Sequence, residues 1–229
     1  MRCVSLLLAF VIVCAPVLAA DAATKTADRL NDSTSLFSEI MSTPDRAIPQ
    51  DLLEKAQCLV LVPDLKKAAL GVGGKYGRGF AVCRAAGGSG WGPPAAIRIE
   101  GGSFGFQIGV SSTDVVMLVM NQRGMKRLSS SKFTIGADAS AAAGPVGRSA
   151  SAQTDAFMSA EILSWSRSKG LFAGASIDGA TLRNDLDENQ LLYGQRWTSK
   201  QILGSGAKVP AMASKLVAVL NKYSMREKK

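Results

Sequence analysis

Apolar residues spaced three and four positions apart predict helices near both ends of the chain. Over residues 27–41 the apolar positions fall on one side of a helix, and Pro44 ends it. A short second helix begins at Pro49, a residue that suits the first turn. Residues 210–223 predict a final helix with one apolar stripe. The two stripes consist of Leu30, Phe37, Ile40 and Met41, and of Met212, Leu216, Val219, Leu220 and Tyr223.

Between these helices the chain is dominated by runs typical of strands. The run CLVLV (58–62) predicts a buried strand, and residues 64–79 predict a short helix that leads into a glycine-rich turn. A strand over 80–85 and a loop, GGSGWGPP, follow. Three strands separated by turn residues are then expected: AAIRIEGG, SFGFQIGV and DVVMLVMN. The last lacks alternation, which indicates that protein covers both of its faces.

Two further local signals lie in the carboxyl-terminal half. The run EILSWSRSKGLFAGASIDG predicts a hairpin of two strands joined around Ser168, Lys169 and Gly170. Thr198 and Gln201 stand at capping-box spacing and predict the start of a helix. No long linker and no internal repeat divides the chain, so we expect one domain.

The stretch FTIGADASAAAGPVGRSA, residues 133–150, carries two charges and little side-chain bulk. If residues 133–143 are extended, one face holds Phe133 and Ile135 followed by alanines, so bulk falls away along the strand. Such a strand fits a place where another element packs close to the backbone. Close packing is our first interpretation, and a backbone cradle for a ligand is the alternative.

The composition places the chain among ordinary globular proteins. It has 229 residues, of which 47% are hydrophobic and 20% charged, and it can bury a substantial core. The 23 glycines and the scarcity of long helical patterns favour strands. We therefore expect a single-domain α+β fold, with a strand-rich, antiparallel, barrel-like sheet and a few flanking helices.

The amino-terminal residues have the pattern of a secretory signal. A basic start at Arg2 precedes an apolar run and then small residues, and cleavage would follow Ala19 or Ala22. An uncleaved anchor is the alternative, because the apolar run is nearly long enough to cross a bilayer. The bulky residues before Cys14 disfavour lipidation. The expected location is the periplasm, the cell envelope or the exterior of the cell.

Export would leave Cys58 and Cys83 as the cysteines of the mature chain, because Cys3 and Cys14 precede both cleavage positions. Both lie in short runs typical of strands. In an oxidising compartment they are expected to form a disulfide bond. Two buried free thiols are the alternative.

The formal charge is +9, and it stays at +9 without residues 1–22, because Arg2 and Asp21 leave together. A basic exported protein meets anionic lipid headgroups or envelope polymers more often than nucleic acid. We therefore expect an anionic lipid or membrane surface as partner and no nucleic acid, with solubility alone as the alternative explanation. The candidate lipid-binding residues are Lys66, Lys67, Lys75, Arg78, Arg148, Arg167 and Lys169.

Several common kinds of catalytic and metal site lack their residues. The chain has no histidine, which excludes Ser-His-Asp and Cys-His catalysis and histidine-based metal sites. In GVGGKYGRG the lysine is followed by Tyr76, so a glycine-rich turn is favoured over a Walker-type loop, with an anion-holding turn as the alternative. In DLDENQ, Gln190 replaces the glycine of a calcium loop, so a solvated acidic turn is expected. We expect no catalytic residue, no metal ligand and no cofactor.

Several long segments resemble one known family. DVVMLVMN, KFTIGADASAAAGPVGR, EILSWSRSKGLFAGASIDGA and NQLLYG occur in this order and at these distances in the SYLF domain family, also known as the yeast actin-regulator family. The upstream run GWGPPAAIRIEGGSFGFQIGVSSTD is similar to the first half of that domain. The likeness covers roughly residues 48–220, and the chain resembles the exported bacterial members.

This resemblance implies binding rather than catalysis. Eukaryotic members bind phosphoinositide membranes and, in fungi, actin filaments, partly through an amphipathic N-terminal helix; bacterial members resemble lipid-associated envelope proteins. The helix over 27–41 occupies the matching place, but it carries Asp28, Asp32 and Glu39 against Arg29 alone. Core packing is therefore its expected role.

We predict four segments: a signal peptide over residues 1–22, an N-terminal helix and linker over 23–47, a SYLF domain over 48–225 and a basic tail over 226–229. The predicted function is non-catalytic binding of anionic lipid or phospholipid at the cell envelope through basic surface residues. The alternative is an envelope scaffold or protein-interaction module, actin-binding-like by descent, with a protein as its partner.

Overall fold

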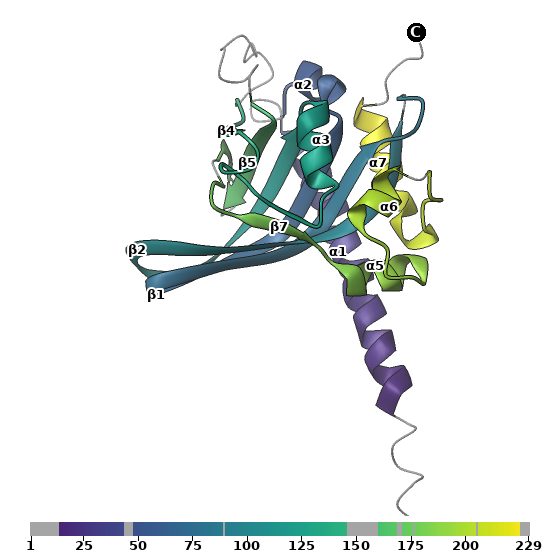
Figure 1. The fold of residues 1–229 in the computed structure, drawn as a ribbon, viewed down its shortest axis with the longest axis horizontal. Helices are drawn as coiled ribbons and strands as arrows, with labels where there is room; N and C mark the ends of the chain where they lie inside the picture. Colours follow the sequence, from purple (N-terminus) through teal and green to yellow (C-terminus); the bar gives the residue numbers. More distant parts are fainter. Residues whose placement is uncertain are drawn as a thin grey trace, which may run out of the picture.

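Two long strands, β1 (Cys58–Arg84) and β2 (Trp91–Val119), form the centre of the structure (Figure 1). The computed structural model describes residues 14–43, 48–88, 90–145, 160–168, 171–175, 177–204 and 206–224, with the backbone alone for 14–19, 69–72 and 103–108. The shorter strands are β3 (Lys132–Thr134), β4 (Ala141–Ala143), β5 (Ile162–Ser168), β6 (Leu171–Gly174) and β7 (Thr181–Asn184). The helices are α1 (Cys14–Ser42), α2 (Gln50–Lys55), α3 (Gln122–Leu128), α5 (Leu186–Tyr193), α6 (Ser199–Gly204) and α7 (Ser214–Ser224), with a 3₁₀ turn η1 (Ala211–Ala213) before α7.

β1 and β2 pair as one antiparallel hairpin, from Cys58 opposite Val119 to Arg84 opposite Trp91. The helix and glycine-rich turn predicted over residues 64–79 are therefore wrong. The division of the later segment into three strands is wrong as well, and so is the predicted loop at its start, since Trp91 already belongs to β2. Pairing with β2 supplies the backbone hydrogen bonds that a helix would otherwise provide, so the local pattern is overridden.

The glycines of β1 permit a close approach rather than a turn. A Cβ atom on Gly79 would lie 2.0 Å from the carbonyl oxygen of Leu61, and one on Gly77 would lie 2.9 Å from the side chain of Leu65. Both neighbours belong to the first half of the same strand. β1 therefore bends back on itself, and its two halves meet at a distance that only glycine allows.

A disulfide bond joins Cys58 and Cys83, near the two ends of β1, which confirms the predicted pairing. Beside it the backbone N–H of Arg84 donates to the carbonyl oxygen of Gln57 at 2.9 Å. These links hold the β1–β2 hairpin folded back on itself. The middle residues of both strands therefore project farthest from the rest of the sheet (Figure 1).

In the described part of the chain, the sheet has seven strands in the order β3-β7-β2-β5-β4, with β1 on β2 and β6 on β5. Only the β4–β5 pair is parallel among these pairings. β2 pairs with β7 along residues 97–100 and with β5 along residues 114–119, so the sheet curls. The fold is a single α+β domain, as predicted.

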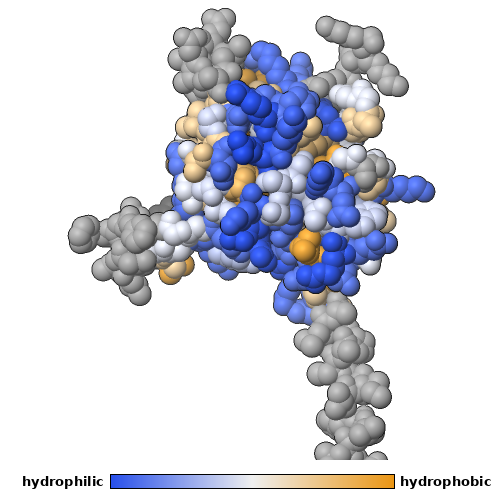
Figure 2. Space-filling model, viewed as in Figure 1, coloured by the Kyte–Doolittle hydropathy of each residue, from blue (hydrophilic) through white to orange (hydrophobic). Residues whose placement is uncertain are grey.

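The sheet is buried on both faces. On β2, Val116 and Leu118 join a core formed with α1, α2 and α7, whereas Val115 and Met117 join a second core on the other face. This confirms the prediction that protein covers both faces of the strand formed by DVVMLVMN. Leu128 of α3 belongs to the second core, while the outer surface over α3 is strongly hydrophilic (Figure 2).

α1 starts earlier than predicted, at Cys14, but its apolar side performs the predicted core packing. Leu30, Phe37, Ile40 and Met41 are all buried, and the Phe37 ring meets the Tyr223 ring edge-on with centroids 5.9 Å apart. Among the residues that the structure describes, no helix has both the length and the apolar character needed to span a bilayer.

The small-residue stretch is not one strand. Between β3 and β4 the chain makes a tight turn at Gly136, whose φ is 85°, and the Asp138 carboxylate accepts the Thr134 N–H at 2.7 Å. Close packing is confirmed farther along, because a Cβ on Gly144 would lie 2.1 Å from the ring of Trp165. Small residues are therefore required where the chain crosses that ring.

Two further local predictions are confirmed, and one about the last helix is wrong. β5 and β6 form the expected hairpin, with Ser168 opposite Leu171. The capping box is present, since the Thr198 N–H donates to the Gln201 side chain at 2.9 Å. In the last helix Met212 is 40% exposed rather than inward, because it lies in the 3₁₀ turn, which shifts the register before α7.

Candidate functional site

The middle of the bent hairpin projects from the sheet as an arm (Figure 1). β7 pairs with β2 only as far as Glu100, and β5 pairs with it only from Asp114. Between these points β1 is the one described strand that pairs with β2. We define the arm as residues 66–76 of β1 and 101–113 of β2.

Three lysines of the predicted set lie on this arm. Lys66 and Lys67 are exposed, and Lys75 is half-buried. The Lys66 ammonium lies 3.4 Å from the carboxylate of Asp64, whereas Lys67 forms no ion pair within the described part of the chain. The Lys75 ammonium donates to the backbone carbonyl of Asp178 at 3.1 Å.

The charges of Lys67 and Lys75 act on each other. Partial burial, and then the nearby Lys67 charge, lower the pKa of the Lys75 ammonium, while Asp178 opposes this shift. An anion placed between the two lysines would relieve their mutual repulsion and favour the charged form of Lys75. The arm is therefore electrostatically suited to an anionic partner.

Apolar side chains accompany these lysines on the arm. Val110 is 82% exposed, more than any other large hydrophobic side chain that the structure describes, and Tyr76 is 50% exposed. The stretch over residues 101–113 contains no charged residue at all. The arm thus combines lysines on its β1 side with an uncharged, partly apolar segment on its β2 side.

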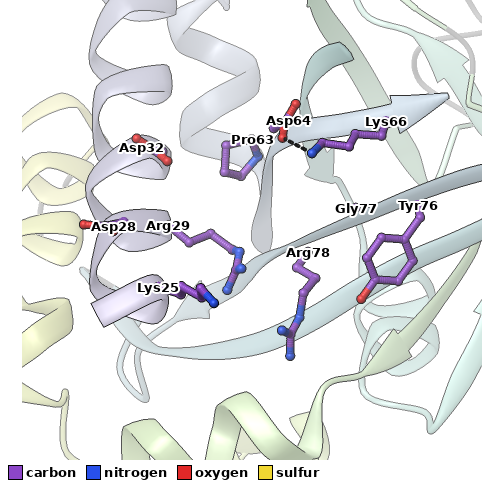
Figure 3. A pocket seen from close by; sticks show the side chains of 10 residues that line it. All are labelled: Lys25, Asp28, Arg29, Asp32, Pro63, Asp64, Lys66, Tyr76, Gly77 and Arg78. Carbon is purple, nitrogen blue, oxygen red and sulfur yellow. Dashed lines mark ion pairs between the residues drawn. The ribbon is translucent and has the colours of Figure 1, made fainter. Parts of the chain in front are cut away.

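A cavity of about 290 Å³ lies between the base of the arm and α1 (Figure 3). Its lining carries both signs of charge: Lys25, Asp28, Arg29 and Asp32 come from α1, and Asp64, Lys66 and Arg78 come from β1. Four cations face three carboxylates, and two of the cations, Arg29 and Arg78, are already paired with Glu188 and Asp185. An anion has no clear advantage here over water or a cation.

Arg78 belongs to a buried ion cluster below this cavity. Its Nε lies 2.6 Å from Oδ2 of Asp185 and 3.5 Å from Oε2 of Glu188, and Arg29 also binds Glu188. Asp185 and Glu188 are each 1% exposed. The solvated acidic turn predicted here is therefore wrong, because two arginines from distant segments supply the countercharges that allow burial.

The pKa shifts in this cluster follow from its contacts. The hydrogen bond to Asp185 raises the pKa of the Arg78 guanidinium, although burial opposes this. Burial raises the pKa of the Glu188 carboxyl, and the charges of Arg29 and Arg78 oppose that rise. Arg78 is thus committed to the protein's own acids.

The remaining predicted residues divide into two groups. Arg167 binds Asp114, with Nε 2.7 Å from Oδ2, and also binds Glu39 of α1, so its charge is neutralised within the fold. Arg148 and Lys169 lie outside the described residues. Of the predicted set, the structure places Lys66, Lys67 and Lys75 on the arm, and the charges of Lys67 and Lys75 act on each other.

Sequence reasoning missed a second set of cations beside α3. Arg123, Lys126, Arg127 and Lys132 line one cavity. The signal was available, since NQRGMKRLSSSK holds four cations and no acid. Within the described residues, no group of three or more His, Cys, Asp or Glu side chains is placed to hold a metal ion.

The fold and the site define a single-domain α+β protein with a curled sheet and a basic hairpin arm. A family model described as "Las17-binding protein actin regulator" (Ysc84) matches residues 100–223, more than half of the chain. The chain therefore belongs to the Ysc84/SYLF family, as its motifs indicated. This is a family of binding and regulatory proteins.

Curated relatives agree with this assignment. The chain is 35% identical over 179 residues to Protein YSC84 of Saccharomyces cerevisiae, covering 77% of this chain and 38% of that protein. It is 31% identical over 191 residues to the Homo sapiens SH3 domain-containing YSC84-like protein 1, covering 82% and 55% respectively. The chain thus spans between 38% and 55% of the length of these two relatives.

Proposed function

We propose that this protein is a non-catalytic module that binds anionic lipid surfaces at the cell envelope, and that the arm makes the contact. The observation that carries the proposal is the exposure of Val110, at 82%, on a projecting hairpin that also holds Lys66, Lys67 and Lys75. The arm thus carries both apolar and cationic side chains, a combination that matches the chemistry of a lipid headgroup region.

Each part of the arm has a physical role in this proposal. A lysine near an anionic bilayer contributes about 1 kcal/mol, an attraction that salt weakens. Val110 and the ring of Tyr76 would enter the boundary between headgroups and acyl chains, where aromatic rings with a polar end are favoured. Anionic headgroups would also relieve the repulsion between Lys67 and Lys75.

Export is part of the same proposal. α1 runs through both cleavage positions, but among the side chains described its burial begins at Thr26. Cleavage after Ala19 or Ala22 would therefore leave every described core contact of α1 in place. Amino-terminal sequencing of protein recovered from the envelope fraction tests this step, and an intact Met1 in that fraction would contradict cleavage.

Vesicle co-sedimentation tests the lipid contact. Wild-type protein should bind vesicles containing phosphatidylglycerol and lose binding as salt is raised. The double variant Lys67→Glu/Lys75→Glu should bind at least about tenfold more weakly, since two attractive charges become repulsive. Lys200→Glu/Lys215→Glu is the matched control, because both lysines are exposed, lie on α6 and α7, and change the net charge equally.

Two outcomes would refute the arm as the contact. One is equal loss of binding in the arm variant and in the control, which would mean that only net charge matters. The other is equal, salt-insensitive binding to neutral and anionic vesicles.

A protein-interaction module is the second candidate function. The family description favours it, since it names Las17 binding, and a yeast relative is named LAS seventeen-binding protein 3. In this case purified protein would retain a protein partner from envelope extracts while ignoring vesicles of every composition. The co-sedimentation experiment therefore separates the two candidates.

A further inference from the structure

A cavity of about 500 Å³ opens beside α3, away from the arm. Its basic lining comes from α3 and from the start of β3, and the surface over α3 is strongly hydrophilic (Figure 2). The cations that line it are Arg123, Lys126, Arg127 and Lys132, and Glu161 lies in its wall. We call this cavity the α3 cleft.

Local structure brings these cations to one place. The Asn121 side chain caps α3 by accepting the Gly124 N–H at 2.9 Å. After α3 the hydroxyl of Ser130 lies within hydrogen-bonding distance of the carbonyl oxygens of Arg127 and Lys132. This turn returns Lys132 to the side of α3, so that Lys132 and Lys126, six residues apart in the chain, line the same cleft.

α3 is also held firmly against the sheet. A Cβ on Gly124 would lie 2.7 Å from Val119 and 3.1 Å from the carbonyl oxygen of Glu161. The helix therefore sits directly on β2 and on the residue before β5. A fixed helix holds the backbone that carries these basic side chains in place, so no backbone ordering is needed when a ligand binds.

The cleft holds an excess of positive charge. Its lining includes four cations and two carboxylates, Asp138 and Glu161. Arg123 pairs with Glu161 at 3.3 Å, but within the part of the chain that the structure describes, Lys126, Arg127 and Lys132 form no ion pair. Arg78 and Arg167, in contrast, are bound by the protein's own acids. The three unpaired cations are thus available to an anion.

Glu161 sets a second requirement for a ligand of the α3 cleft, besides negative charge. The residue is only 8% exposed, and among the residues that the structure describes none donates a hydrogen bond to its Oε2 atom, although Oε1 faces Arg123. A buried carboxylate oxygen without a donor is costly. A ligand that fills this cleft is favoured if it brings a hydrogen-bond donor to Glu161 as well as negative charge to the cations.

We propose that the α3 cleft binds a phosphate monoester that carries a hydroxyl group. The phosphate lies among Lys126, Arg127 and Lys132, where a guanidinium donates paired hydrogen bonds to phosphate oxygens, and the hydroxyl donates to Oε2 of Glu161. This site is separate from the arm, and its binding of a ligand does not depend on the arm. A soluble ester and a lipid headgroup can both present this chemistry, and the experiment separates them.

Isothermal titration of the full chain with glycerol 3-phosphate and with inorganic phosphate tests the soluble form. Wild-type protein should bind the ester more tightly than inorganic phosphate. Lys126→Ala/Arg127→Ala should weaken ester binding at least tenfold, while the matched control Lys200→Ala/Lys215→Ala and the arm variant Lys67→Glu/Lys75→Glu leave it unchanged. Glu161→Gln should bind inorganic phosphate normally, which reports a folded cleft, and should lose the preference for the ester.

Vesicles containing lysophosphatidic acid, a lipid that joins a phosphate monoester to a free hydroxyl, test the lipid-borne form. The variant Lys126→Ala/Arg127→Ala should lose binding to these vesicles and keep binding to phosphatidylglycerol vesicles. This result assigns the cleft to a lipid headgroup even if the soluble ester fails to bind. The proposal is overturned if wild-type protein binds no ester and this variant binds both kinds of vesicle like wild type. Equal wild-type affinity for inorganic phosphate and glycerol 3-phosphate would overturn the role given to Glu161.

Discussion

The guanidinium of Arg78 and the buried carboxylate of Asp185 form an ion pair, with Nε 2.6 Å from Oδ2, although 107 residues separate them in the chain. Asp185 also caps α5 by accepting the Glu188 N–H at 3.3 Å. The pair therefore ties β1, which carries the arm, to the helices at the carboxyl end. Its charges act within the fold, and this separates Arg78 from the exposed lysines of the arm.

Removing Arg78 should destabilise the protein strongly. Arg78→Met leaves Asp185 and Glu188 buried with only Arg29 to balance them, and we expect a loss of about 3 kcal/mol in the free energy of unfolding. Urea denaturation measures it. Arg196→Met is the control, since its pair with Asp187 is exposed and should change stability by less than about 1 kcal/mol. Equal effects of both substitutions would contradict the buried cluster.

Stability should depend on the ionisation of Glu188. Burial raises the pKa of this carboxyl above its usual value of 4.5, against the opposing charges of Arg29 and Arg78. A carboxyl with a raised folded-state pKa holds its proton more tightly in the folded protein. Its favourable contribution is complete below the usual pKa and is lost as the pH rises through the folded-state value.

The difference between wild type and Glu188→Gln isolates this effect. We expect the free energy of unfolding of wild type minus that of the variant to decrease as the pH rises above about 4.5. Urea titrations at several pH values provide the measurement. Burial also raises the pKa of Asp114, but this group titrates in both proteins and cancels in the difference. A difference that stays flat or grows with pH would disprove the prediction.

Reduction of the disulfide should release the bend of β1. Cys58 and Cys83 are 25 residues apart, and closing a loop of that length stabilises by roughly 3–4 kcal/mol on the chain-entropy model. Guanidinium denaturation with and without reductant should show a loss of that order, and Cys58→Ser/Cys83→Ser should match the reduced protein. Two alkylatable thiols at these positions in native, unreduced protein would contradict the bond.

Gly144 should tolerate no side chain. In Gly144→Ala the new Cβ would lie 2.1 Å from the ring of Trp165, and the resulting strain should cost about 1–3 kcal/mol or more. Gly204→Ala is the control, because outside its own helix turn no atom of the described residues lies within 4 Å of a Cβ there. Thermal unfolding of both variants measures the difference. A neutral Gly144→Ala variant would remove close packing as the reason for the small-residue stretch.

Features that depend on near neighbours were readable from the sequence. The apolar side of α1, the two covered faces of β2 around Val116 and the capping box at Thr198 all follow from periodicity or short spacing. In each case the residues that decide the structure lie within one or two turns or one strand of each other. Patterns of three, four or two positions record which side of an element meets the core, and this is a local property.

Tertiary structure alone decided the rest. The lysine- and glycine-rich run became a strand because β2 supplied its hydrogen bonds, and Gly79 is required because the first half of the same strand packs against it. Asp185 is buried because Arg78 reaches it from a distant segment. Whether a charge stays free for a ligand depends on which opposite charge the fold places beside it, and no local pattern contains that information.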